Sequence, residues 1–175
     1  MRLGMALGVA LCAACTGEVD VWLVDRSEPD AESELFIGEA ELPLDVVEAR
    51  RADGWVDLAR GPNPYNLLDF SGAPTPIDLA TLRDEGVRLA HDELPVGEIT
   101  ALRLRLLPDE ELELEDEHGI DHDVAPPAPD TLEVPVTVEV LGSRPAVVTL
   151  ALDVHAAFRE EVGGGYVFAP SLTVE

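Results

Sequence analysis

The chain has 175 residues, is 46% hydrophobic and 5% aromatic, and carries 36 Asp and Glu against 11 Lys and Arg, a formal net charge of -25. So acidic a chain is repelled by phosphate backbones and anionic lipid surfaces, which argues against nucleic acid as a partner. Its length fits one domain, and its abundant apolar residues argue against disorder. We interpret the acidic excess as solvated surface, with cation binding by some carboxylates as the alternative.

Residues 1–14 have the pattern of a signal peptide. Arg2 precedes a charge-free run from Leu3 to Ala14, which is shorter than the roughly 20 apolar residues that a transmembrane helix needs. The small residues before Cys15 resemble the lipobox of bacterial lipoproteins, although Cys12 stands where that pattern prefers Leu. We therefore predict a lipoprotein signal peptide over 1–14 and a lipidated N-terminus and tether over 15–17. The alternative is an ordinary secretory peptide cut at the same place.

The lipobox resemblance implies a cellular location as well as a lipid anchor. Cleavage before Cys15 and acylation of its thiol would leave no free thiol, because Cys12 would be removed. The next residue is Thr16 rather than Asp, which by lipoprotein sorting rules implies the outer membrane. Acyl chains alone would then make the membrane contact, since the mature chain would carry a net charge of -26 after the loss of Arg2.

Beyond residue 18, apolar and polar residues alternate with the period of half-buried strands. The clearest run is 132–140, in which Pro135 indicates an edge strand or a bulge. Asp53-Gly54 between alternating runs predicts a hairpin turn. The remaining alternating segments are 19–24, 42–46, 55–59, 99–107, 112–115, 147–154 and 166–174.

Helical signals are confined to 77–84, with Asp78 near its start, and to 154–162 before a run of three glycines. Short strands separated by Gly, Pro and Asp are typical of all-β domains. We therefore predict one domain over 18–175, an antiparallel β-sandwich of the immunoglobulin or transthyretin type with one or two short helices.

One segment concentrates residue types that bind metals. Carboxylates suit Ca²⁺ and imidazoles suit transition metals, but the spacing matches neither an EF-hand loop nor a His-Glu-x-x-His zinc motif. The alternative, which we favour, is a polar turn at Gly119 with solvated charges. We expect no cofactor, and retain as a candidate divalent-cation site Asp116, His118, Asp121, His122 and Asp123.

No catalytic motif stands out. His91 beside Asp92 and Glu93 has no evident nucleophile, and the chain lacks a Gly-x-Ser-x-Gly elbow and a phosphate loop. We expect a protein that is not an enzyme, with a metal-dependent hydrolase as the enzymatic alternative. The larger aromatic residues fit either a core or a sugar-stacking platform: Trp22, Trp55, Tyr65, Tyr166 and Phe168.

The succession of several short motifs resembles the bacterial lipoprotein family called domain of unknown function 4382. The motifs are a strand ending in Leu-x-Asp at 21–25, Asn-Leu-Leu-Asp-Phe at 66–70, Leu-Pro-x-Gly at 94–97 before an Arg-Leu strand, a strand of sequence Leu-Ala-Leu-Asp-Val at 150–154, and Gly-x-Tyr to Pro at 164–170. The chain departs from the pattern at Glu98-Ile99-Thr100, where an aromatic residue is usual. The resemblance implies a β-sandwich outside a bacterial membrane and assigns no catalytic residue.

These observations together predict a lipid-anchored β-sandwich of the bacterial cell envelope, with a binding or structural role. Its membrane partner would be reached through the N-terminal lipid, and its protein or glycan partner is not identified. The alternative is a divalent-cation-binding or carbohydrate-binding surface domain.

Overall fold

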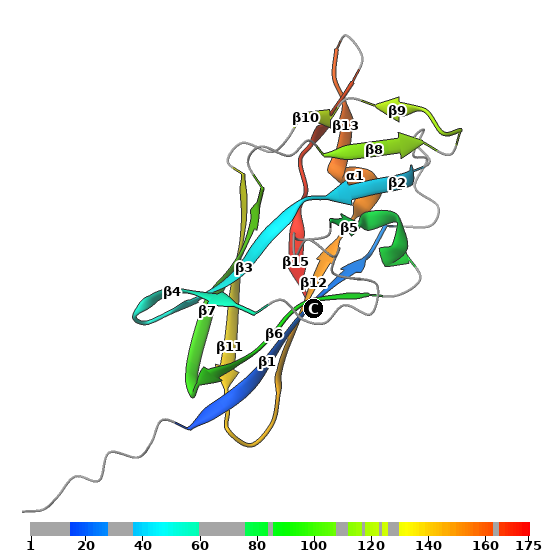
Figure 1. Cartoon of the computed structure of the whole chain (residues 1–175). Helices are drawn as coiled ribbons and strands as arrows, with labels where there is room; N and C mark the ends of the chain where they lie inside the picture. The colour runs from blue at the N-terminus through cyan, green and yellow to red at the C-terminus, as the bar shows by residue number, and fades with distance from the viewer. Residues whose placement is uncertain are drawn as a thin grey trace, which may run out of the picture.

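The computed structural model describes residues 15–27, 37–59, 76–83, 86–107, 112–116, 118–122, 124–125, 130–162 and 165–175. Almost all of its regular structure is β-strand, arranged in two larger sheets and two smaller ones (Figure 1). None of the described helices is long and apolar enough to cross a membrane.

The first large sheet is built around the N-terminal strand. Its order is β15-β12-β1-β6, formed by β15 (Leu172–Val174), β12 (Ala146–Leu152), β1 (Thr16–Asp25) and β6 (Val87–Pro95). β1 is antiparallel to β6 but parallel to β12. Residues 16 and 17, which we expected in a tether, are the first two residues of this strand.

The second large sheet has the order β11-β7-β3-β4, formed by β11 (Thr131–Val140), β7 (Gly97–Leu106), β3 (Leu44–Arg51) and β4 (Gly54–Leu58). The predicted hairpin turn at 53–54 is confirmed, with Gly54 at a φ of 127° that favours glycine. The prediction for Pro135 is also confirmed, because β11 is an edge strand whose register shifts between Pro135 and Val138.

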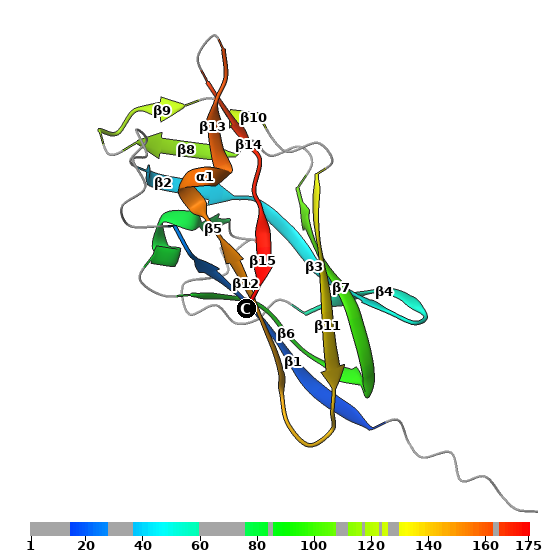
Figure 2. The same cartoon turned by 180° about the vertical axis from the view of Figure 1, so that it is seen from behind.

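Two smaller sheets lie at one end of the molecule. One has the order β5-β2-β8-β9, from β5 (Ile77–Asp78), β2 (Ile37–Leu42), β8 (Glu113–Asp116) and β9 (Asp121–His122). The other has the order β10-β14-β13, from β10 (Val124–Ala125), β14 (Tyr166–Phe168) and β13 (Phe158–Glu160). Figure 2 shows β13 and β14 at the end opposite the β6–β7 turn.

The two predicted helices are shorter than expected. Within 77–84, residues 77–78 form β5 and a 3₁₀ helix, η1 (Leu79–Arg83), follows. Within 154–162, α1 (Val154–Ala157) makes a single turn before β13 begins. The carboxylate of Asp153 caps α1 by accepting a hydrogen bond from the Ala156 N–H at 2.9 Å.

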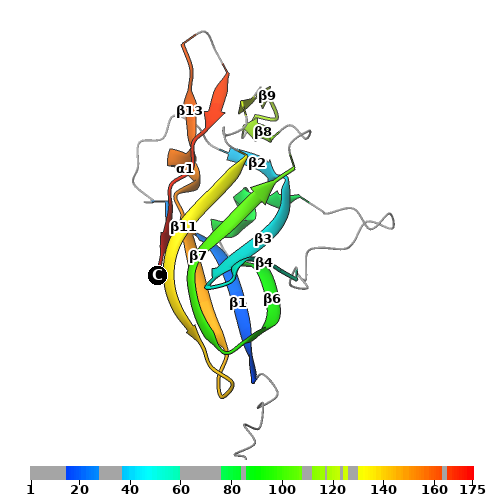
Figure 3. The same cartoon turned by 90° about the vertical axis from the view of Figure 1, so that its left-hand side faces the viewer.

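One apolar core joins the two large sheets, which face one another in Figure 3. Val19, Val21 and Leu23 of β1 belong to the same buried cluster as Leu102 and Leu104 of β7. The predicted mostly β fold is therefore confirmed. The β1–β12 and β10–β14 pairs are parallel, unlike the antiparallel pairing that we expected. Turn signals report only on neighbouring strands, whereas β1 and β12 are separated by most of the chain.

Candidate functional site

Asp116 organises the turn between β8 and β9. Its Oδ1 accepts hydrogen bonds from the backbone N–H groups of His118 at 2.8 Å and Ile120 at 3.0 Å. Gly119 adopts a φ of 75° within this turn. The carboxylate thus satisfies backbone donors of a tight turn, as short acidic side chains commonly do.

The second oxygen of Asp116 contacts His122, with 3.1 Å between Oδ2 and Nε2. The imidazole meets the ring of Tyr166 edge to face, with 5.2 Å between their centroids. Burial favours a raised pKa for Asp116, but the Ile120 N–H, the His122 ring and the His118 N–H outweigh it and hold that pKa below its usual value. Asp116 and His122 therefore join the β8–β9 hairpin to β14.

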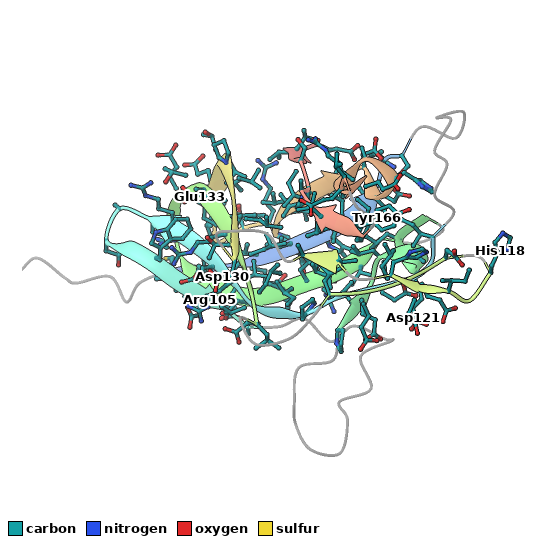
Figure 4. All side chains as sticks on the ribbon, turned by 90° about the horizontal axis from the view of Figure 1, so that it is seen from above. Arg105, His118, Asp121, Asp130, Glu133 and Tyr166 are labelled. Carbon is teal, nitrogen blue, oxygen red and sulfur yellow. The ribbon has the colours of Figure 1, made fainter. Side chains whose placement is uncertain are left out.

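The other candidate ligands do not converge on this pair. His118 and Asp121 are exposed, and Figure 4 shows His118 at the outer tip of the hairpin, directed away from Tyr166. Asp123 lies outside the described residues. Within the part of the chain that the structure describes, no three His, Cys, Asp or Glu side chains are grouped as metal ligands.

His91 has a partner that its sequence neighbours did not indicate. Its Nδ1 lies 2.9 Å from Oδ1 of Asp20 on β1, and Arg88 reaches the same oxygen at 3.3 Å. Asp92 instead accepts a hydrogen bond from the Ala59 N–H, and Glu93 accepts one from the hydroxyl of Thr16. The acidic residues adjacent to His91 therefore serve other contacts.

The aromatic residues do not form a single platform among the described positions. Trp22 lies on the first large sheet under the guanidinium of Arg88, and Trp55 lies on the second under that of Arg103. Phe168 is 1% exposed and packs in the core, as one of our two interpretations predicted. Tyr65 lies outside the described residues.

Sequence reasoning missed an ion pair on the outer face of the second large sheet. Arg103 donates two hydrogen bonds to Glu48, both 2.7 Å long, and Glu48 is only 4% exposed. Arg105 makes a parallel contact with Asp45 at 3.0 Å. The alternating arginines of β7 were visible in the sequence, but their partners follow only from the register between β7 and β3.

A second cluster that sequence reasoning missed joins the carboxyl ends of β1 and β12. Asp25 at the end of β1 accepts hydrogen bonds from the backbone and hydroxyl of Ser27, and the same hydroxyl lies 3.1 Å from Asp153 at the end of β12. Because β1 and β12 are parallel, their carboxyl ends lie at one edge of the sheet. The sequence signal that could have indicated this cluster was that both strands end in a Leu followed closely by an Asp.

The described residues thus form a β-rich domain of several sheets, with ion pairs and a capped hairpin on its surface. The family described as Domain of unknown function (DUF4382) matches residues 16–170, and the chain belongs to this family. No curated protein and no solved structure matches the chain.

Proposed function

We propose that the chain is a bacterial envelope lipoprotein, acylated at Cys15, whose β-sandwich serves a binding or structural role. The observation that carries the proposal is the charge-free run 3–14 ending in small residues directly before Cys15. The family match begins at residue 16, next to the proposed anchor, which supports the same boundary.

The fold supports a sandwich of the immunoglobulin or transthyretin type. The two large sheets share one core, and β1 pairs in parallel with β12 while it pairs antiparallel with β6. The outer face of the second sheet carries the paired charges of Arg103 and Glu48 rather than a catalytic group. We assign this domain a binding or structural role at the cell envelope, with the outer membrane as its location.

Metabolic labelling tests the anchor. Cells that express the full chain and receive an alkyne-bearing palmitate should label the protein, and Cys15→Ala should abolish the label and move the protein to the soluble fraction. Cys12→Leu is the matched control and should keep the label, because it restores the aliphatic residue of the lipobox. An unlabelled wild-type protein would identify residues 1–14 as an ordinary secretory peptide instead.

A further inference from the structure

Cys15 is held directly on the folded domain. Its carbonyl oxygen accepts a hydrogen bond of 2.8 Å from the backbone N–H of Val96, and β1 begins at the next residue, Thr16. A lipid on the thiol of Cys15 would therefore be joined to the domain without a flexible spacer.

Three chain segments meet at this end of the molecule: the start of β1, the β6–β7 turn and the β11–β12 turn (Figure 1). Val96 is 43% exposed at the tip of the β6–β7 turn. Gly142 of the β11–β12 turn lies against the start of β1, where a Cβ at this position would be 3.7 Å from the Cβ of Cys15. The anchor residue and both turns thus form one surface.

A cavity of about 290 Å³ lies at the start of β1, where its lining begins at Thr16, the residue after Cys15. Its polar lining includes the hydroxyl-bearing Thr16 and Ser143, the carboxylates of Glu18 and Glu93, and Arg144. The Thr16 hydroxyl donates a hydrogen bond of 3.3 Å to Glu93. This volume is at the lower end of the range for small-molecule sites, and it suits a compact polar group.

The charges of the cavity favour a ligand that carries both signs. Among the described residues, no carboxylate lies within ion-pair distance of Arg144, so its guanidinium is available to a phosphate. Glu18 and Glu93 would repel a purely anionic group but attract an ammonium group. A phosphate joined to an ammonium group matches both features.

We propose that the Cys15 end of the domain lies against the membrane and that its cavity takes the phosphate–ammonium headgroup of a neighbouring zwitterionic lipid. This inference rests on the proposed acylation of Cys15, which brings the cavity to the headgroup layer. The β8–β9 turn then faces away from the membrane, because it lies at the opposite end of the molecule (Figure 2).

Spin labels on the acylated full chain in vesicles test the orientation. Nitroxides at Val96→Cys and Ile120→Cys compare two exposed apolar positions, 43% and 53% exposed, at opposite ends of the molecule. In phosphatidylethanolamine vesicles, the label at 96 should be several-fold less accessible to a water-soluble nickel complex than the label at 120. A control variant has a flexible linker of about ten Gly and Ser residues inserted after Thr16, followed by a second Thr that restores the first residue of β1. This linker should abolish the difference between the two labels.

Substitution of Arg144 tests the headgroup chemistry. The protection at 96 should be stronger in phosphatidylethanolamine than in phosphatidylglycerol vesicles. Arg144→Gln should weaken the protection at 96 in phosphatidylethanolamine vesicles several-fold, whereas Arg159→Gln, which removes the same charge from another exposed arginine, should leave that protection unchanged. Equal protection of the label at 96 in Arg144→Gln and in the wild type would show that general charge repulsion alone sets the lipid preference, and it would overturn the headgroup site.

The remaining outcomes separate this inference from the anchor. A vesicle-bound protein whose labels at 96 and 120 are equally accessible would overturn the membrane-facing orientation and leave acylation standing. Failure of the wild-type protein to associate with vesicles would overturn both proposals.

Discussion

Arg103 and Glu48 face each other across β7 and β3 in a two-point ion pair, with both nitrogen–oxygen distances at 2.7 Å. The indole of Trp55 covers the guanidinium, 4.2 Å from its ring centroid. The Glu48 side chain is thereby only 6% exposed on the outer face of the sheet, and that of Arg103 is 26% exposed. The geometry of the pair makes each partner necessary for the burial of the other.

Truncation of Arg103 is expected to destabilise the domain strongly. Arg103→Ala leaves the carboxylate of Glu48 buried without its partner, and we expect the free energy of unfolding to fall by about 3 kcal/mol. Urea titration followed by circular dichroism measures the loss. Arg159→Ala, an exposed control, should change stability by no more than about 0.5 kcal/mol. The double variant Arg103→Met/Glu48→Leu should regain most of the loss, and a double variant as unstable as Arg103→Ala would contradict the proposed cause.

The same pair predicts how stability depends on acid. Hydrogen bonds from Arg103 lower the pKa of Glu48 more than burial raises it, and the charge of Arg105 lowers it further. The folded state therefore binds fewer protons at this site, so its contribution is full above the ordinary pKa of 4.5 and is lost as pH falls through the lowered value. Between pH 7 and pH 3, the urea concentration at the midpoint of unfolding should begin to decrease once the pH is below about 4.5. The midpoint should decrease less steeply with pH in Glu48→Gln than in the wild type. If the midpoints of both proteins changed in parallel with pH, the contribution of Glu48 would be ruled out.

Removal of the Asp116 side chain should loosen the β8–β9 turn without unfolding the domain. Asp116→Ala removes the acceptor for two backbone N–H groups, so the amide protons of His118 and Ile120 should exchange faster. Hydrogen exchange followed by NMR gives the rates, and Asp121→Asn on the adjacent strand is the control. If a chelator accelerated the same amides in the unaltered protein, the segment would be a cation site rather than a self-supported turn.

Gly17 should tolerate no side chain. A Cβ at this position would overlap the carbonyl oxygen of Leu141 and lie 3.0 Å from Cγ1 of Val140, so β1 could not keep its place. We expect Gly17→Ala to cost more than about 1 kcal/mol of stability through overpacking. Gly142→Ala, whose Cβ would lie 3.2 Å from the carbonyl oxygen of Thr16, should cost less. Equal thermal midpoints for Gly17→Ala and the wild type would show that the strands can separate.

Local features of the fold could be predicted because neighbouring residues determine them. The turn at Gly54, the bulge that follows Pro135 and the inward faces of β7 and β11 all depend on residues within a few positions. Alternation also identified which leucines are buried, including Leu112 and Leu114 beside the acidic residues of β8.

Contacts between distant strands could not be predicted in the same way. His91 pairs with Asp20 because β6 lies beside β1, and no local pattern specifies that register. The 116–123 segment contains many residue types that can bind metals, but its sequence does not show where each side chain points. Only the structure shows that Asp116 binds its own turn.

The parallel pairing of β1 with β12 has a consequence for how the chain folds. β1 is an interior strand of its sheet, yet its partner β12 belongs to the last part of the sequence. The apolar residues of β1 therefore stay without one neighbour until residues 146–152 have emerged during synthesis or export. Contacts of such long sequence separation form slowly, and β1 must be kept from pairing with other chains until β12 arrives.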